Sequence, residues 1–264
     1  MYTSQDHTFV ICAYKENPHI EDTIKSLQNQ TVKSHIILST STPNEFLENI
    51  CKKYEISMYV NPERKGAGAD WNYGYMQAKT ELITVAHQDD FYEPDYTEEI
   101  LKYANLRDDT LIIFSDYYEF RIEEKVTSNK IMRIKRIMNA PLTRKMFYGS
   151  KFMRRLGLSL GDAICCPAVT YVKKNVGDNP FDTKYINSCD YKTLVDIAKK
   201  KGAFICIPKQ LVAHRIYPES ATSLNLSENI RQKEDFEIFC EFWPKPIARL
   251  INRVYATSEK SNEI

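Results

Sequence analysis

The sequence has little of what marks secreted, membrane-spanning or zinc-knuckle proteins. Its seven cysteines are odd in number and form no CxxC pair, which argues against a disulfide framework or a zinc knuckle. No apolar run approaches the ~18 residues of a membrane span. The N-terminus MYTSQDHTFVICAY lacks the basic start and the small-residue cleavage site of a signal peptide. We therefore expect a cytoplasmic protein that is soluble or bound at a membrane surface.

Neither composition nor charge indicates disorder or nucleic-acid binding. Of the 264 residues, 43% are hydrophobic and 27% are charged, as in ordinary globular proteins, and the sequence has no internal repeat or low-complexity linker. It has no known nucleic-acid motif, and outside one basic segment the chain is net acidic. The length suits a single α/β core. We expect no nucleic-acid partner.

The basic segment runs from Lys130 to Leu160 and holds nine Lys or Arg residues and no acidic residue. Such a segment carries a positive field. Ile131, Ile134 and Ile137 recur at helical spacing and predict an amphipathic helix over about 130–138. The segment is either a solvated helix face or a contact for an anionic partner.

Short β-rich runs alternate with helical patterns through the first part of the chain. The runs cover residues 8–13, 35–39, 56–60 and 82–86, and the helical patterns cover about 20–28, 43–54 and 69–78. This alternation predicts a parallel sheet with crossover helices. In such a sheet, ligands bind at the carboxyl ends of the strands. The segments expected there are polar or turn-forming: Cys12 to Glu16, Ser39 to Thr42, Asn61 to Gly68, and His87 to Asp90.

The second half continues the sheet in a less regular order. We expect strands over 110–115, 164–172 and 204–207, a turn over 175–180 and a helix over 189–199. The tail carries apolar residues on one face of a helix over 247–255. That face either packs on the parent domain or a second subunit, or lies in a membrane interface.

An acidic pair directly follows the apolar run over 82–86. The side chains of Asp89 and Asp90 emerge at the carboxyl edge of the expected sheet, where they can hold a divalent cation. Mg²⁺ or Mn²⁺ takes one or two carboxylates and completes its shell with phosphate oxygens and water, as the binding of a nucleotide diphosphate requires. Taken alone, the pair is equally typical of a turn or a helix cap.

Several motifs, in order, resemble glycosyltransferase family 2, the inverting GT-A enzymes. The run FVICAYKENPHIEDTIKSLQNQT is similar to the family's opening strand and helix, and NPERKGAGADWNYGYMQAKTELITVAHQDD is similar to its segment ending in the D-x-D-D metal site. Two positions depart from the family pattern. The acidic loop that reads uracil is Ser39 to Thr42 here, and the first Asp of D-x-D-D is His87. This imidazole is either a metal or sugar ligand or a polar strand end.

The resemblance implies a GT-A fold: an α/β, Rossmann-like, mostly parallel central sheet with flanking helices and a C-terminal acceptor-binding lobe. It assigns residues 1–120 to nucleotide-sugar binding, 121–217 to the basic helical segment and the acceptor and catalytic part, and 218–264 to a helical tail. By resemblance, the nucleotide sugar contacts Cys12, Ala13, Tyr14, Glu16, Thr40, Ser41, Lys65, Gly66, Asn72, His87, Gln88 and Asp89. The implied metal ion, Mn²⁺ or Mg²⁺, is held by Asp89, Asp90 and His214.

The segment from GDAICCPAVTYV to AHRIYPESAT resembles the family's acceptor region. The family's base is the Asp of an E-D pair at a helix start, which is Cys189-Asp190 here, so the resemblance implies that Asp190 deprotonates the acceptor hydroxyl. An Asp in a first helical turn is also a common helix cap. His214 stands where the family often places a His near the metal or the leaving phosphates; a lone His at a strand end is otherwise structural.

By resemblance, the chain is a metal-dependent inverting glycosyltransferase with a nucleotide diphosphate donor, UDP by preference, acting in surface glycan or polysaccharide synthesis. Its acceptor is a glycan or a lipid-linked sugar, and the basic helix contacts the anionic inner face of the plasma membrane. A non-catalytic GT-A domain that binds or scaffolds within a glycan assembly complex is the alternative. A nucleotidyltransferase is disfavoured, because CAYKENPH lacks a Gly-rich phosphate loop. The sequence does not decide whether the protein forms a homodimer.

Overall fold

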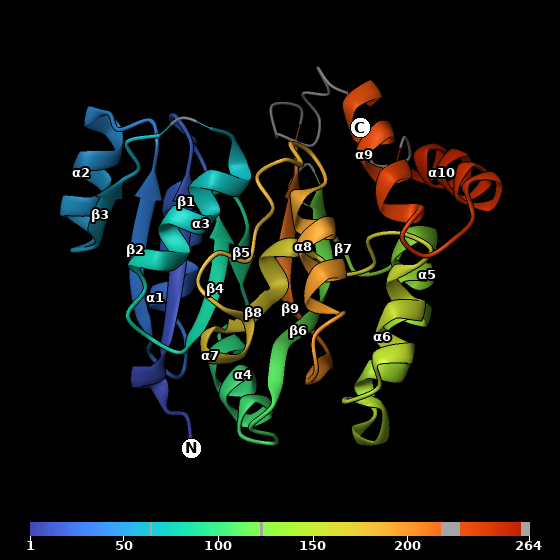
Figure 1. Cartoon of the computed structure of the whole chain (residues 1–264). Helices are drawn as coiled ribbons and strands as arrows, with labels where there is room; N and C mark the ends of the chain where they lie inside the picture. The colour runs from blue at the N-terminus through green and yellow to red at the C-terminus, as the bar shows by residue number, and fades with distance from the viewer. Residues whose placement is uncertain (64, 122–123, 218–227, 260–264) are drawn as a thin grey trace.

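One curled sheet runs through the computed structural model of the chain (Figure 1). The structure describes residues 1–63, 65–121, 124–217 and 228–259. The strands lie in the order β3-β2-β1-β4-β8-β6-β9-β5, and β7 pairs with β6. Helices flank the sheet, and apolar side chains are buried on both of its faces. The expected α/β architecture is confirmed.

The N-terminal half has the expected alternation of strands and helices. It contains β1 (His7–Ala13), α1 (Ile20–Gln28), β2 (His35–Thr40), α2 (Glu45–Lys53), β3 (Ser57–Val60), α3 (Ala67–Gln77) and β4 (Leu82–His87). β1 pairs in parallel with β2 on one side and with β4 on the other, and β2 pairs in parallel with β3. The strand order therefore reverses between β1 and β4. Their carboxyl ends form a topological switch point, where ligands bind in such sheets.

The pairing register brings the ends of these strands to one edge. Ala13 is level with Thr40, and Cys12 is level with His87. Gly74 allows α3 to lie close to this edge: a Cβ there would come 2.7 Å from the nearest side-chain atom of β1 and 2.9 Å from that of β2. Any larger residue would therefore push α3 away from the strands.

The second half contains antiparallel neighbours as well as a parallel pair. Its elements are β5 (Phe91–Tyr92), α4 (Tyr96–Ala104), β6 (Thr110–Arg121), β7 (Glu124–Val126), α5 (Lys130–Asn139), α6 (Lys151–Leu158), β8 (Val169–Val172), α7 (Lys173–Val176), α8 (Cys189–Ile197) and β9 (Ala203–Ile216). Short 3-10 helices span Ser4–Asp6, Ala140–Thr143, Lys145–Phe147 and Cys166–Ala168. β8 lies antiparallel between β4 and β6, while β9 runs parallel to β6 and antiparallel to β5.

The strand expected over 164–172 is shorter than predicted. Its first half forms the 3-10 turn Cys166–Ala168, because a proline at the centre of that turn has no N–H for a sheet ladder. The strand β8 therefore begins only at Val169. The turn expected over 175–180 begins inside α7.

The strand expected over 204–207 is much longer than predicted. Pro208 lies where the pairing of β6 with β9 shifts its register, so the strand passes the proline at an irregularity and continues to Ile216. His214 consequently lies within β9, and not beyond a strand that ends early. This extension brings the end of β9 beside β5 and hence close to the end of β4.

The tail forms α9 (Glu228–Phe239) and α10 (Lys245–Glu259). The indole N–H of Trp243 donates to the carbonyl oxygen of Ser159 at 2.8 Å, and the ring of Tyr255 lies against Gly161, so α10 packs on the parent domain. In Figure 1, α5, α6 and α10 lie together at the end of the molecule opposite β3. None of the helices in the described part of the chain has the length and apolar character to cross a bilayer.

Candidate active site

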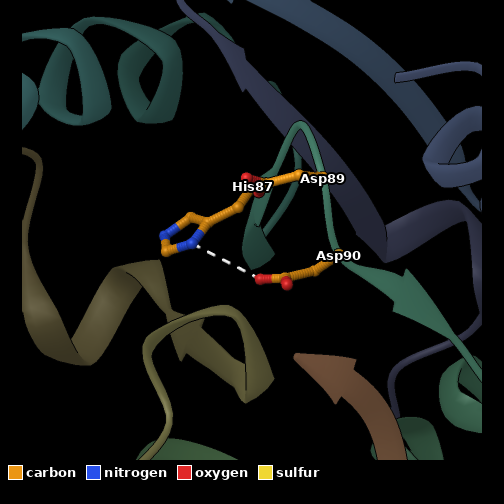
Figure 2. A group of neighbouring side chains, drawn as sticks. All are labelled: His87, Asp89 and Asp90. Atoms are coloured by element: carbon orange, nitrogen blue, oxygen red, sulfur yellow. Dashed lines mark ion pairs between the residues drawn. The ribbon is translucent and has the colours of Figure 1, made fainter. Parts of the chain in front are cut away.

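Three side chains converge at the carboxyl end of β4. The ligand atoms of His87, Asp89 and Asp90 lie within 4.8 Å of one another. Figure 2 shows the imidazole of His87 directed toward the carboxylate of Asp90, with Nδ1 3.5 Å from Oδ2. His87 is the last residue of β4, and the two aspartates lie in the turn that leads to β5. Two carboxylates and an imidazole thus meet at the switch point of the sheet.

Asp90 is fully buried and is fixed by groups from distant parts of the chain. Its Oδ1 accepts a hydrogen bond from the backbone N–H of Arg215 at 2.8 Å and lies 3.1 Å from Nδ1 of His214. Its carbonyl oxygen accepts a hydrogen bond from the hydroxyl of Thr23, on α1, at 2.7 Å. β9 therefore holds the carboxylate of Asp90 in place, and α1 holds its backbone.

The attraction between Asp90 and two imidazoles shifts the pKa values of these groups. Burial opposes ionisation of Asp90, but the charges and hydrogen bonds of His214 and His87 lower its pKa well below the ordinary value. Burial opposes the protonation of both imidazoles, yet Asp90 raises the pKa of His87 and that of His214. Burial, followed by the charge of Asp90, raises the pKa of Asp89. The arrangement keeps Asp90 ionised between two imidazoles.

Asp89 is oriented by residues that follow β1 and β9. Its Oδ2 accepts a hydrogen bond from the hydroxyl of Tyr217 at 2.9 Å, and that hydroxyl accepts one from the side-chain amide of Asn17 at 2.9 Å. Arg215 donates from Nε to the carbonyl oxygen of Asp89 at 3.0 Å, and its Nη2 pairs with Asp22 at 3.1 Å. The guanidinium of Arg215 therefore stabilises the turn that carries the two aspartates.

The donor set of this cluster fits Mn²⁺ or Mg²⁺. Within the residues that the structure describes, His87 Nε2 and Asp90 Oδ2 are buried and have no hydrogen-bond partner. Unpartnered buried polar atoms are rare, because each one costs free energy. Carboxylates suit both ions, and a neutral imidazole nitrogen can serve as a further metal ligand. His214 is not in this group; its contact is with the far oxygen of Asp90.

Gln88 joins the loops that follow β1 and β4. Its side-chain oxygen accepts the backbone N–H of Tyr14 at 3.0 Å, and its side-chain amide donates to the carbonyl oxygen of Tyr14 at 3.1 Å. The backbone N–H of Lys15 donates to Oγ1 of Thr42 at 2.6 Å, which ties the loop after β2 to the same edge. The ring of Tyr14 is 55% exposed, and Glu16 is exposed as well, so both side chains are accessible to a ligand.

The other predicted donor contacts lie at the ends of β1 and β2 and around α3. Cys12 and Ala13 end β1, while Thr40 and Ser41 are buried at the end of β2. Lys65 and Gly66 are exposed just before α3, and Lys65 pairs with Glu63 at 2.9 Å. The side-chain amide of Asn72 donates to the carbonyl oxygen of Phe181 at 2.8 Å and accepts from its N–H at 3.0 Å. These bonds give Asn72 a structural contact that joins α3 to the turn before α8.

Trp71 connects the cluster at β4 to the second half of the chain. Its ring stacks on His87, with centroids 5.4 Å apart and planes at 18°, and meets Phe181 edge-on at 5.2 Å. In the first turn of α3, a Cβ at Gly68 would lie 3.5 Å from a cysteine sulfur at the start of α8. α3 therefore contacts both His87 and the first turn of α8, which carries Asp190.

Helix α9 fixes the turn that carries Asp190. The carboxylate of Glu234 accepts hydrogen bonds from three consecutive backbone N–H groups, Ile186 to Ser188, at 2.7, 2.9 and 2.9 Å. The hydroxyl of Ser188 donates to Asp235 at 2.7 Å. Glu234 and Asp235 are both buried. The half-buried Asp190 follows directly in the first turn of α8, so the tail helix fixes the backbone just before it.

The thiol of Cys165 is affected by carboxylates from both parts of the site. Burial, followed by the charge of Asp90, raises the pKa of its thiol, and the charges of Asp162 and Asp190 raise it further. The positive charge of Lys135, from α5, opposes them. The charges of Asp90 and Asp190 thus both act on this thiol.

Comparison with known proteins decides the family. The family model described as "Glycosyl transferase family 2" matches residues 8–208. The chain belongs to this family. It is also 28% identical over 115 residues to EpsH of Bacillus subtilis (strain 168), whose name assigns it only provisionally to the glycosyltransferases. That match covers 42% of this chain and 33% of EpsH, so it spans about a third of the relative.

Solved structures confirm the GT-A fold of this family member. Residues 1–349 of S. aureus TarS in complex with UDP-GlcNAc align with a TM-score of 0.64 and 11% identity, over 94% of this chain and 70% of that one. The mannosyltransferase PcManGT from Pyrobaculum calidifontis, in complex with GDP-Man and Mn²⁺, aligns with a TM-score of 0.63 and 13% identity, over 97% and 70%. At such identities the likeness concerns the fold.

Several residues of the candidate site were not found from the sequence. Tyr217 contacts Asp89 across 128 positions, and Glu234 contacts the turn before Asp190 across 46 to 48 positions. Asp70 contacts Ser41 across 29 positions. No local spacing marks these residues, because their roles depend on tertiary contacts.

Proposed function

We propose that this protein is a metal-dependent inverting glycosyltransferase, which transfers a sugar from a nucleoside diphosphate donor to a hydroxyl acceptor. The observation that carries the proposal is that α3 contacts both the cluster of His87, Asp89 and Asp90, through Trp71, and the start of α8, where Asp190 lies. This arrangement offers one place for a diphosphate and, close by, a carboxylate that can act as a base.

Asp89 and Asp90, with His87, would hold Mn²⁺ or Mg²⁺. When bound, such an ion offsets the negative charge of a departing diphosphate. The N–H of Arg215 and the hydroxyl of Tyr217 keep the two carboxylates in position for this task. The role of His214 as a metal ligand stays a prediction, while its contact with Asp90 supports a positioning role.

Asp190 would accept the proton of the acceptor hydroxyl. As that O–H bond breaks, the acceptor oxygen forms a bond to the anomeric carbon from the face opposite the leaving group. The bond between this carbon and the diphosphate oxygen breaks, and its electron pair stays on the diphosphate. Displacement from the opposite face inverts the configuration of the sugar. Glu234 supports this role, because it fixes the turn before Asp190.

The donor would be a UDP sugar or a related nucleoside diphosphate sugar. Similar solved structures hold UDP-GlcNAc or GDP-Man, which supports this class of donor. The exposed ring of Tyr14 and the loop after β2 would flank the nucleoside. The acceptor would be a glycan or a lipid-linked sugar in the synthesis of a surface glycan.

A donor screen tests the proposal. Purified protein is incubated with UDP, GDP, CDP and ADP sugars in Mn²⁺, Mg²⁺ or excess EDTA, and the release of nucleoside diphosphate is measured. We expect release only with a metal ion, and equal release in EDTA would refute the metal assignment. If calorimetry detects no binding of any nucleoside diphosphate, that result favours the non-catalytic binding or scaffolding role. The presence of His87 in place of a carboxylate of the family pattern also fits that role.

A basic and apolar surface supports attachment to a membrane. We define this interfacial surface by exposed apolar side chains at helical spacing on or next to three helices: Ile134 and Ile137 of α5, Phe152, Leu156 and Leu160 at α6, and Ile247, Leu250 and Val254 of α10. Their exposed fractions range from 45% to 73%. Of the nine basic residues in the segment, Arg154 is buried, Arg136 pairs with Asp116, and Lys135 faces the buried Tyr117, so the other six supply the positive field.

The partner we assign to the interfacial surface is an anionic bilayer. Helices that lie in a membrane interface combine an apolar face with Lys and Arg, and anionic lipids attract those charges. A second copy of the chain fits less well, because a two-fold interface through this surface would bring like charges together. Attachment here would bring the protein to lipid-linked acceptors.

A further inference from the structure

A carboxylate from α3 is fixed at the carboxyl ends of β2 and β3. Asp70 lies in the first turn of α3, and its two oxygens accept hydrogen bonds from the hydroxyl of Ser41 and from the side-chain amide of Asn61, both at 2.7 Å. Asn61 also donates its backbone N–H to the carbonyl oxygen of Thr40 at 2.8 Å. The bonds lock one acidic side chain to the ends of two strands.

This carboxylate lies beside a loop that contains no acid of its own. Residues Ser39 to Thr42 offer only hydroxyl groups after β2. Burial, followed by the charge of Asp70, raises the pKa of Cys12, so the carboxylate also lies near the end of β1. β2 is two positions from β4 in the sheet, or about 10 Å at the usual strand spacing. That separation suits a nucleoside whose diphosphate reaches the cluster at the end of β4.

The remaining acceptor capacity of Asp70 is available to a ligand. An ionised carboxylate accepts about four hydrogen bonds and donates none. Ser41 and Asn61 supply one each and are both buried, whereas the side chain of Asp70 is partly exposed. The two buried partners orient the carboxylate, and a ligand that donates a hydrogen bond would complete its coordination.

We propose that Asp70 selects the base of the nucleoside diphosphate donor by accepting a hydrogen bond from a ring N–H. The inference rests on the function proposed above. Uracil and guanine carry such an N–H, whereas cytosine and adenine present an acceptor nitrogen at the corresponding edge, which a carboxylate repels. A hydrogen bond to a charged acceptor discriminates by about ten-fold or more. The donor therefore contains uracil or guanine.

Nucleotide titration tests the assignment. UDP, GDP, CDP and ADP are titrated by calorimetry, with Mn²⁺, into the full chain and into Asp70→Asn. We expect the wild type to bind UDP or GDP at least about ten-fold more tightly than CDP or ADP. In Asp70→Asn this preference should disappear, because a carboxamide both donates and accepts. The ratio of affinities does not depend on the folded fraction of the sample. An unchanged ratio in the variant would overturn the assignment.

Two controls distinguish base recognition by Asp70 from a general charge effect and from ribose binding. Asp108→Asn makes the same change at an exposed site before β6 and should keep the wild-type preference. If 2′-deoxy-UDP removes the difference between wild type and Asp70→Asn, Asp70 binds the ribose and the base assignment is wrong. Equal binding of all four nucleotides by the wild type refutes only the role of Asp70, whereas binding of none refutes the proposed function itself.

Discussion

Asp90 and His214 are in contact although 124 positions separate them: Oδ1 of the carboxylate lies 3.1 Å from Nδ1 of the imidazole. The contact depends on β9, which passes Pro208 and pairs with β5 through Phe91 and Ala213. The first half of the chain thus supplies the acids at the switch point, and the second half supplies the groups that fix them. Neither half alone would hold Asp90 in this position.

Replacing Asp90 with Asn should weaken metal-dependent nucleotide binding by about 100-fold. The carboxamide oxygen can still accept the N–H of Arg215, but the charge that would hold the cation is lost. Calorimetric titration of the best-bound nucleoside diphosphate, with Mn²⁺ and with EDTA, measures the effect. Asp108→Asn serves as the control and should behave as the wild type. Wild-type affinity of Asp90→Asn in Mn²⁺ would exclude Asp90 from the metal site.

Replacing Asp190 with Asn should lower kcat by about 10²–10⁴ and leave nucleotide affinity unchanged, because the carboxamide cannot take the acceptor proton. If Asp190 only favours the dipole of α8 from its first turn, the change should instead cost about 0.3–1 kcal/mol in the free energy of unfolding and leave turnover intact. Single-turnover transfer and urea denaturation distinguish the two results. Asp196→Asn on the same helix, where the acid pairs with Lys192 and Lys199, is the matched control.

The fold was largely predictable where local pattern and tertiary role agree. In the N-terminal half, buried strands alternate with amphipathic helices, and the helix expected over 20–28 has those bounds in the structure. The prediction was incomplete where tertiary contacts override a local signal. β9 passes Pro208 because the ladder with β6 tolerates an irregularity there. Helix α6 contains Gly157, a poor helix former, which lies close to the backbone of α5: a Cβ would be 3.0 Å from the carbonyl oxygen of Met138.

The site was predictable only in its outline. Asp89 and Asp90 follow an apolar strand, and that position is visible in the sequence. The side chains that orient them are not visible, because Tyr217 and Arg215 reach them only through the fold. Asp70 looks like any acid in a first helical turn until the bonds to the strand ends are seen.

Glu234 should act as a positioning residue for Asp190. In Glu234→Gln one of the two acceptor oxygens is replaced by an amide, so the three N–H groups of Ile186 to Ser188 lose part of their anchor. We expect kcat to fall by about ten-fold or more, while KM for the donor stays near the wild-type value. Glu237→Gln, on the exposed face of the same helix, should change neither. A lower melting temperature with unchanged kcat would leave Glu234 with a purely structural role.

The interfacial surface should bind anionic vesicles. We expect the protein to float with vesicles that contain phosphatidylserine and to stay at the bottom of the gradient when the vesicles contain phosphatidylcholine alone. High salt should release it from the anionic vesicles. The triple variant Ile137→Ser, Phe152→Ser and Leu250→Ser should no longer float with vesicles. It should still bind nucleotide, because these side chains are exposed to solvent and their replacement leaves the fold intact. If the serine variant instead changes a dimer into a monomer in sedimentation, the surface binds a second copy. Flotation with neutral vesicles at high salt would contradict the role of charge.

His7 should make the fold sensitive to acid. The side chain is fully buried between Ser34 and Thr84, each 2.9 Å from one ring nitrogen, and burial, followed by the charge of His35, lowers its pKa to about 3. The folded state keeps this ring neutral, whereas the unfolded chain takes up a proton below about pH 6.5. The stability that depends on the neutral ring is therefore fully present above that pH and is lost as the pH falls toward 3.

This loss amounts to about 2 kcal/mol of unfolding free energy between pH 7 and pH 5, at about 1.4 kcal/mol for each pH unit below 6.5. Urea denaturation at the two pH values measures it. His7→Asn should be less stable than the wild type at pH 7, because it loses buried contacts, but the gap should narrow at pH 5, since the variant has no proton to gain there. The other titrating groups are common to both proteins and cancel in the comparison. A gap of the same size at both pH values would show that the ring titrates in the folded state with its ordinary pKa, and a wider gap at pH 5 would show that it is already protonated there.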